Sequence, residues 1–254
     1  MVRKLHKPLV VTGNEYHKFI WLGLDEADAE KGILTNQYLI VHNSEGILLD
    51  PGGYFVFQKV LEAVSQYLDT TKIKAIFYSH QDPDVVGSIN LLLDFFPNAN
   101  IYISALWTRF LPHLGAIADL NIIEIPDNGA IIKIGGVNLE AIPAHFLHSP
   151  GNFTLYDHNL KVMFTGDIGA AVFPKNEWYL YVNNFDKHLA YIEGFHRRYL
   201  CCKKALDYWL SRVKDLDIEI LAPQHGAIFQ GPTVSRFLSW LSTLEKIGID
   251  MLYD

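Results

Sequence analysis

The sequence predicts an α/β protein in which two β-sheets pack together and helices cover their outer faces. Short apolar strands rich in β-branched residues fall into two clusters, and amphipathic helices separate and follow them. No repeat, low-complexity tract or linker divides the chain, and its 254 residues, half of them apolar, can bury a sizeable core. We therefore expect a single domain that spans residues 1–254.

The first half of the chain alternates strands with helices after an opening group of strands. Turn signals such as Gly13-Asn14 separate the first short apolar runs. An amphipathic pattern at i, i+3, i+4 and i+7 predicts a helix that ends near Phe96. The expected strands are 9–12, 19–22, 37–42, 47–49, 73–78 and 101–104, and further helices are expected over 57–67 and 106–113.

The second half returns to strands and ends in helices. Pro232 suits the first position of the last helix, because its fixed φ fits a helix start and its missing N–H has no helical partner to lose. The expected strands are 122–125, 131–134, 137–143, 153–156, 162–164 and 218–221. The expected helices are 185–198, 201–214 and one that begins at Pro232.

Composition excludes several classes of protein. The formal charge is −7 and no run is rich in Lys or Arg, which argues against a nucleic-acid partner or an anionic membrane surface. Met1–Lys4 is basic, but neither a signal-peptide core nor a membrane-spanning apolar run of about 18 residues is found. The neighbours Cys201 and Cys202 cannot frame a disulfide set, so we expect buried, reduced helix positions and a cytoplasmic location.

One stretch between a strand and a helix combines an imidazole with two carboxylates. His80, Asp82 and Asp84 follow the apolar strand expected over 73–78. If this loop is extended, alternation sends the three side chains to the same side, where they begin a metal site. The alternative is a solvated Asp-rich turn that caps the next helix, and this stretch alone leaves both interpretations open.

Three later strand ends share the same pattern, because each brings a potential metal ligand next to Gly or Pro. His148 precedes Ser-Pro-Gly, Asp167 ends the run Thr-Gly-Asp, and His225 lies between Gln224 and Gly226. A single histidine of this kind is more often a structural residue than a ligand. Four such strand ends in one chain favour a metal site.

The order of these motifs resembles the metallo-β-lactamase superfamily over roughly residues 8–230. Its hydrolases usually carry His-x-His-x-Asp-His, whereas this chain has a carboxylate, Asp82, at the second position. That pattern is similar to the diiron domain of flavodiiron proteins, and most similar to stand-alone oxygen-binding diiron proteins without a flavodoxin module. The resemblance implies an α/β, metallo-β-lactamase-like αββα four-layer sandwich.

The resemblance also implies a ligand set for two iron ions. The six ligands are His80, Asp82 and His148 on the first iron, Asp84 and His225 on the second, and Asp167 as the bridge. The ions would be Fe2+ or Fe3+ with a bridging oxo, hydroxo or peroxo group, and no FMN is expected in this chain.

Other residues near the motifs are expected to support the ligands. Asp50 would orient a ligand or a turn, and His145 would support a ligand or be structural. The chain departs from the family pattern where Asp82 is shorter than the usual Glu and where Ser149 replaces a common Trp. Val85 stands where many relatives have a histidine, which leaves room for exogenous ligands on the second iron. Five nearby aromatics could line the pocket, although core packing is favoured for most of them: Phe146, Phe153, Trp178, Tyr179 and Tyr181.

The donor set favours iron on chemical grounds. Carboxylate-rich ligation suits a hard, redox-active metal, and the extra carboxylate opposes the Lewis acidity that a hydrolase needs. If O₂ binds as peroxide while both irons become ferric, the net charge of the site stays constant, so a low-dielectric pocket tolerates the step.

We therefore expect a non-haem diiron protein that binds O₂ as a diferric-peroxo type of adduct. It would act as an oxygen or iron sensor for a signalling partner, and the resemblance implies a pathway such as chemotaxis and a homodimer. The alternatives are an oxidoreductase that reduces O₂ or NO with an external donor (a flavoprotein or rubredoxin), a dinuclear metal hydrolase, and a domain that binds no metal.

Overall fold

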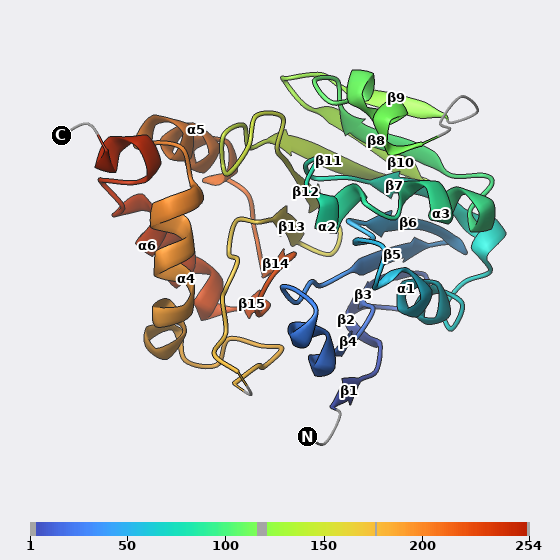
Figure 1. The fold of residues 1–254 in the computed structure, drawn as a ribbon, viewed down its shortest axis with the longest axis horizontal. Helices are drawn as coiled ribbons and strands as arrows, with labels where there is room; N and C mark the ends of the chain where they lie inside the picture. Colours follow the sequence, from blue (N-terminus) through green and yellow to red (C-terminus); the bar gives the residue numbers. More distant parts are fainter. Residues whose placement is uncertain (1–3, 116–120, 176, 253–254) are drawn as a thin grey trace.

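Two mixed β-sheets lie face to face between two layers of helices. The computed structural model describes residues 4–115, 121–175 and 177–252, so the basic start at 1–3 lies outside the described residues. Figure 1 shows α1 to α3 on one side of the strands and α4 to α6 on the other. The expected four-layer αββα sandwich is confirmed.

The first sheet has seven strands and consists of an antiparallel part followed by a parallel part. It is antiparallel from β2 to β6 and parallel from β6 to β9. In spatial order the strands are β2 (Leu9–Gly13), β3 (His17–Trp21), β5 (Tyr38–His42), β6 (Glu45–Leu49), β7 (Ile73–Phe77), β8 (Asn100–Ser104) and β9 (Ile122–Ile125).

The second sheet has six strands, of which β13 and β14 are the parallel pair. In spatial order the strands are β10 (Ala130–Ile134), β11 (Val137–Pro143), β12 (Phe153–Asp157), β13 (Val162–Gly166), β14 (Ile220–Pro223) and β15 (Phe229–Gln230). A separate two-stranded ribbon joins β1 (Leu5–His6) to β4 (Leu24–Asp25).

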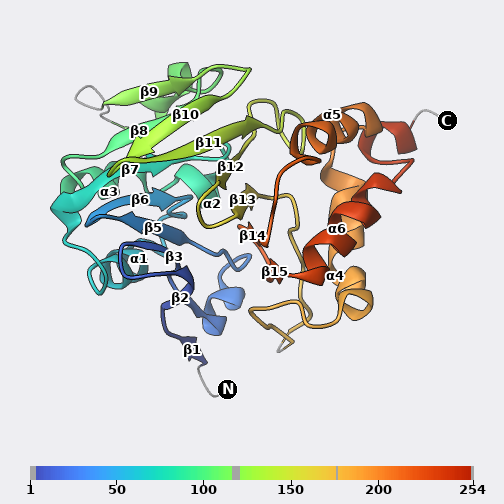
Figure 2. The same ribbon diagram turned by 180° about the vertical axis from the view of Figure 1, so that it is seen from behind.

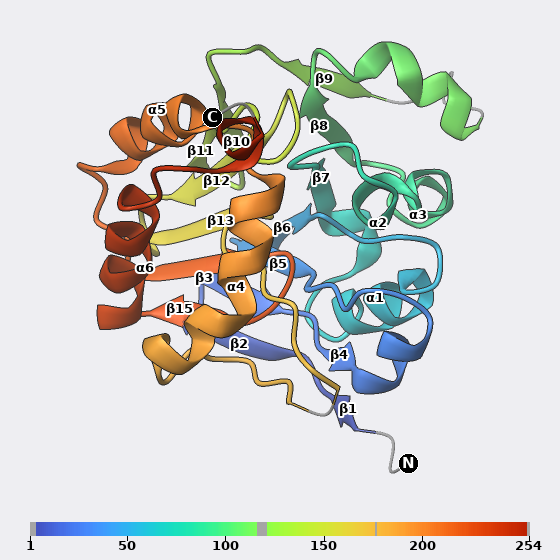
Figure 3. The same cartoon turned by 60° about the vertical axis from the view of Figure 1, so that its left-hand side comes forward.

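Three apolar clusters hold the four layers together. One lies between the sheets, one joins the first sheet to α1–α3, and one joins the second sheet to α4–α6. Figure 3 shows α4 and α6 beside β13, β14 and β15. The helices are α1 (Phe57–Val64), α2 (Pro83–Val86), α3 (Ile89–Phe95), α4 (Phe185–Tyr199), α5 (Lys203–Val213) and α6 (Pro232–Ser242). Short 3-10 turns are η1 (Glu26–Glu30), η2 (Thr70–Lys72), η3 (Thr108–Leu114) and η4 (Gly248–Met251).

Most expected elements are present, and the differences have local causes. The helix expected over 106–113 is the 3-10 turn η3, which contains Pro112. The expectation that Cys201 and Cys202 occupy helix positions is wrong. They lie half-buried in the junction between α4 and α5, because the extended conformation of Leu200 ends α4 before them.

Strand direction brings the motif-bearing loops to one edge of the sandwich. The ends of the parallel strands β6 and β7 lead to Asp50 and His80, and the ends of β13 and β14 lead to Asp167 and His225. The view from behind in Figure 2 shows β12, β13 and β14 beside the strands of the first sheet. Within the described ranges, no helix is long and apolar enough to cross a membrane.

Candidate metal centre

Three side chains from two loops form the first half of the centre. His80 follows β7, Asp82 precedes α2, and His148 lies between β11 and β12. His148 Nε2 lies 2.9 Å from Asp82 Oδ2, and His80 Nε2 lies 3.7 Å from the same oxygen. Donors that share an ion at about 2 Å are themselves about 3 Å apart, so these separations suit ligands of one metal.

Asp167 lies between all three histidines. Its Oδ1 is 3.9 Å from His80 Nε2 and 3.5 Å from His225 Nε2, and its Oδ2 is 3.6 Å from His148 Nε2. Gly166 allows this approach, since a Cβ at its φ of +54° would lie only 2.7 Å from Ser79 Oγ. A carboxylate in this position can serve two ions at once.

Asp84 and His225 form the second half of the centre. His225 Nε2 lies 3.2 Å from Asp84 Oδ2, while its Nδ1–H donates to the carbonyl of Leu34 at 2.9 Å. Asp84 was expected on an extended loop, but it lies in the first turn of α2, which Pro83 begins. The structure therefore brings all six expected side chains together, although Asp84 arrives from a helix.

A buried carboxylate supports His80 from behind. Asp50 Oδ1 accepts from the Ser79 backbone N–H at 2.7 Å, and Asp50 Oδ2 accepts from the Ser79 hydroxyl at 2.5 Å. Ser79 Oγ also lies 2.8 Å from His80 Nδ1, which leaves Nε2 toward the centre. Burial raises the pKa of Asp50 to about 7, against the opposing effects of His80 and Ser79. The sequence pointed to Asp50 but missed Ser79, whose position next to His80 was the available signal.

The loop that carries His148 is fixed by its own polar contacts. His145 Nε2 lies 2.8 Å from the carbonyl of Asp127, and its Nδ1 accepts from Gly151 N–H at 3.2 Å, so both ring nitrogens contact the backbone. Ser149 Oγ lies 2.8 Å from Gln81 Oε1 and ties this loop to the one that carries His80. Phe146 has a φ of +67°, which is strained for a bulky residue and occurs where the loop turns.

Two buried atoms of the cluster have no hydrogen-bond partner among the described residues. They are His80 Nε2 and Asp167 Oδ1. Buried polar atoms without partners are rare in folded proteins, and a metal ion would satisfy both. Together with three carboxylates beside three imidazoles, this shows that the residues fit a pair of hard, redox-active metal ions.

Without metal, the carboxylates and imidazoles pair with each other. Burial lowers the pKa of His80, but Asp167 and Asp82 outweigh it and raise that pKa to about 9. The same competition between burial and the carboxylates of Asp167 and Asp84 raises the pKa of His225 to about 9. Burial raises the pKa of Asp82, yet His148 and His80 hold it well below its usual range.

Two aromatic side chains that the sequence analysis did not single out lie near the centre. The rings of Phe195 and Tyr199, both on α4, lie 6.3 Å and 5.8 Å from the ring of His148. Their i, i+4 spacing was a visible signal, but nothing in the sequence showed that this face of α4 covers a metal loop. Of the expected aromatics, Phe153 is core between the sheets, while Trp178 and Tyr181 pack against that core.

Val85 is fully buried in the apolar cluster between α2 and the first sheet. A histidine there would bury an imidazole among aliphatic side chains such as Val86 and Ile89. Val85 therefore contributes to the packing of α2 against the first sheet.

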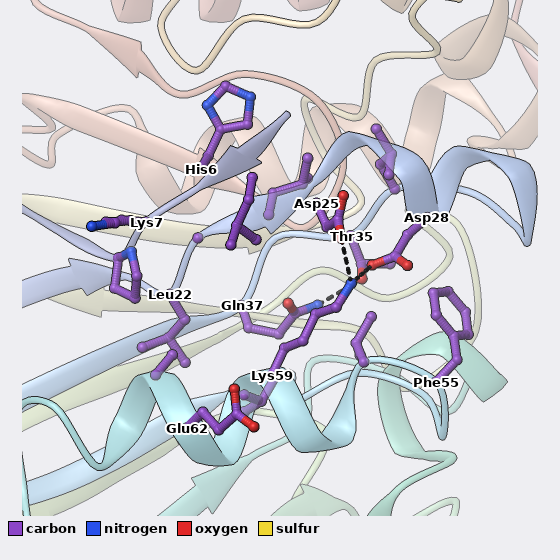
Figure 4. A pocket seen from close by; sticks show the side chains of 18 of the residues that line it. His6, Lys7, Leu22, Asp25, Asp28, Thr35, Gln37, Phe55, Lys59 and Glu62 are labelled. Atoms are coloured by element: carbon purple, nitrogen blue, oxygen red, sulfur yellow. Dashed lines mark hydrogen bonds and ion pairs between the residues drawn. The ribbon is translucent and has the colours of Figure 1, made fainter. Parts of the chain in front are cut away.

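A cavity of about 340 Å³ lies between the β1–β4 ribbon and α1, and none of the six clustered side chains lines it. Figure 4 shows Lys59 crossing it toward Asp25 and Asp28. Lys59 Nζ donates to Asp28 and lies 3.4 Å from Asp25 Oδ2, so buried carboxylates pair with the ammonium group. The apolar walls of the cavity include Leu34, whose backbone carbonyl accepts the hydrogen bond from His225 Nδ1.

The fold and the cluster define a metallo-β-lactamase-like domain with a carboxylate-rich cluster of histidine and aspartate at one edge of the sandwich. The family model described as "ODP family beta lactamase" matches residues 33–226, and the chain belongs to that family.

Solved structures of similar fold include the chemotaxis sensor ODP. The structure named as its peroxy diiron species is 44% identical with a TM-score of 0.85, and the alignment covers 97% of this chain and 98% of that one. A flavo di-iron protein of Thermotoga maritima has a TM-score of 0.77 at 21% identity, covering 95% of this chain and 61% of that one, and it shows the fold alone.

Sequence relatives are longer proteins. They include an uncharacterized protein of Methanocaldococcus jannaschii (25% identical over 88% of this chain) and the flavo-diiron protein FprA2 of Clostridium acetobutylicum (24% over 78%). The chain spans 57% and 50% of the lengths of these two relatives.

Proposed function

We propose that this protein is a non-haem diiron protein that binds O₂ and reports oxygen or iron to a signalling partner. The observation that supports this most is Asp167, a carboxylate within 4 Å of three histidines that come from separate loops. The likeness to the chemotaxis sensor covers nearly the whole of both chains, so it does not depend on a module that only one of them has.

The assignment of ligands follows the two halves of the cluster. His80, Asp82 and His148 would hold the first iron, and Asp84 and His225 the second, with Asp167 shared. When bound, the iron pair supplies the two electrons that O₂ needs to bind. His80 and His225, whose pKa values are raised to about 9 in the metal-free protein, must lose a proton before they can act as ligands.

The chain's own residues control the surroundings of that site. His80 Nδ1 and His225 Nδ1 face fixed hydrogen-bond partners, Ser79 Oγ and Leu34 O, so their Nε2 atoms stay directed at the centre. His80 and Asp167 are almost fully buried, whereas Asp82 and Asp84 are about 30% exposed. The site is therefore open on the side of Asp82 and Asp84 and buried on the side of His80 and Asp167.

A second candidate is an O₂ or NO reductase fed by a separate electron donor, because proteins with flavodiiron names are among the relatives. A dinuclear hydrolase is disfavoured by Asp82, since a carboxylate in place of a histidine reduces the Lewis acidity of the metal. A chemotaxis pathway, a homodimer and a cytoplasmic location stay predictions.

The test is to mix the anaerobic, iron-loaded protein with O₂, with and without a reduced flavoprotein or rubredoxin donor. We expect one O₂ to bind per two irons and O₂ uptake then to stop in both cases. Sustained uptake with the donor, at ordinary enzyme rates on the order of 10 per second, would favour the reductase instead.

A further inference from the structure

The position of His225 depends on a turn that is held by the opposite sheet. His225 follows β14 of the second sheet in the turn from Pro223 to Gly226. The turn is tight, because Gly226 has a φ of +93° and a Cβ there would lie 2.6 Å from Ala171 Cβ. Backbone carbonyls on both sides of His225 point toward the first sheet, where they need hydrogen-bond donors.

Asn36, at the entrance to β5 of the first sheet, supplies those donors. Its Nδ2 donates to the carbonyls of Pro223 at 3.1 Å and Gly226 at 3.0 Å, and its backbone N–H donates to the carbonyl of Gln224 at 2.5 Å. One residue, only 1% exposed, therefore bonds the backbone before and after His225. An amide group has two donor hydrogens, and this one uses both on the same turn.

The amide of Asn36 is held in one orientation by Trp21. The indole Nε1–H of Trp21 donates to Asn36 Oδ1 at 2.9 Å, and indole nitrogen can only donate. The side-chain oxygen must therefore face Trp21 and the nitrogen must face the turn. Two neighbours add to the same support, since Tyr38 OH donates to the Pro223 carbonyl at 2.9 Å and Leu34 O accepts from His225 Nδ1.

We propose that Asn36 is a positioning residue for the second metal ion, which it serves by fixing His225. It touches no reacting group and acts through the turn, which sets the separations of His225 Nε2 from Asp84 Oδ2 (3.2 Å) and Asp167 Oδ1 (3.5 Å). The identity of the metal rests on the proposed function, but the control of His225 by Asn36 does not.

The second half of the centre is the part that depends on this support. It has two side chains of its own besides Asp167, whereas the first half has three. Replacing Asn36 by Asp keeps the size and the acceptor for Trp21 but turns a carboxylate oxygen toward two carbonyl oxygens. Mutation of a group that orients a metal ligand commonly lowers metal affinity 10- to 100-fold. The second iron should therefore bind to this variant more weakly by that factor. The first iron's ligands come from other loops and should be unaffected.

The experiment compares Asn36→Asp with Asn138→Asp, a matched change at an exposed position on β11. Anaerobic titration with Fe2+ should give two irons in the wild type and in the control. In Asn36→Asp it should give one iron at unchanged affinity and a second at 10- to 100-fold lower affinity. Equal affinities for both irons in this variant would overturn the proposal.

A metal-free measurement keeps the two proposals distinguishable. Amide hydrogen exchange at Gln224 should be faster in metal-free Asn36→Asp than in the control, and unchanged exchange there would also overturn the role of Asn36. If the wild type binds no iron, the proposed function fails, and hydrogen exchange still decides the question of Asn36. If Asn36→Asp does not fold, Tyr38→Phe removes a single donor to Pro223 and should cause a smaller change of the same kind.

Discussion

Two clusters of histidine and aspartate lie at opposite ends of the sandwich. The candidate metal centre lies where β6, β7, β13 and β14 end. His17, His42 and Asp157 lie at the other end, because β5 and β12 run antiparallel to β6 and β13. His17 Nε2 is 2.9 Å from Asp157 Oδ2, and the rings of His17 and His42 are 4.7 Å apart.

The difference lies in how many carboxylates converge. At the metal end three carboxylates from two separate segments meet three imidazoles, and one of the carboxylates, Asp167, lies within 4 Å of all three histidines. At the other end Asp157 also accepts the backbone N–H groups of Asn159 and Leu160, which closes the turn between β12 and β13. In the part of the chain that the structure describes, only the metal end groups three donors closely enough for an ion. A buried His–Asp pair alone is thus a structural feature.

The largest expected effect comes from removing the central carboxylate at each end, Asp167 at the metal end and Asp157 at the other. Asp167→Ala should lose both irons, since Asp167 contacts ligands of both halves. Asp157→Ala should keep both irons but lose about 3 kcal/mol of unfolding free energy, the usual cost of breaking a buried pair. Metal analysis and urea unfolding of both variants measure this. Two irons retained by Asp167→Ala would show that the bridge is elsewhere.

The next effect is a pH dependence that only the metal end should have. Metal-free His80 and His225 have pKa values raised to about 9, so iron must displace a proton from each at neutral pH. Iron affinity should therefore rise about tenfold per pH unit for each proton released, between roughly pH 6.5 and 9. Proton release measured with an indicator dye checks this, and release of no protons at pH 7.5 would contradict it.

The raised pKa values of His80 and His225 also determine how the stability of the metal-free protein changes with pH. Because these pKa values are raised above about 6.5 in the unfolded chain, the stabilisation is complete below that pH. It should be lost as the pH rises through about 9. Thermal unfolding of the metal-free protein from pH 6 to 9.5 tests the direction.

A smaller effect is expected at Val85, which is buried beside the centre. Val85→His should lower the free energy of unfolding by about 2 kcal/mol, because an imidazole is buried among apolar side chains without a partner. Val85→Ala is the control for lost packing alone. If Val85→His is as stable as the wild type and binds the second iron more tightly, the histidine reaches the metal and the packing role is secondary.

The smallest effect concerns the support behind His80. Ser79→Ala removes the hydroxyl between Asp50 and His80 and should weaken the first iron about tenfold while leaving the fold intact. His42→Gln, an equivalent loss of polar contact at the other end, should leave both irons unchanged. Iron titration of the two variants measures this. Equal losses of iron affinity in both would contradict the idea that only the metal end supports the ligands.

The sequence, together with the family resemblance, was sufficient for the fold and for the six side chains that cluster, because the segments that carry them follow apolar strands whose ends meet at one edge. It was not sufficient for contacts made across the sheets. Asn36 is far from His225 in sequence, and nothing near it indicates that its amide bonds the turn. Local conformation was also missed at Asp84, where Pro83 begins a helix instead of an extended loop.

The most direct test of the account is the metal content and O₂ response of the wild-type protein after anaerobic, iron-rich expression. We predict two irons per chain and a new visible absorption band that appears once on mixing with O₂ and persists without further O₂ uptake. Stoichiometric zinc with no iron, or two irons with no spectral change on O₂ addition, would contradict it.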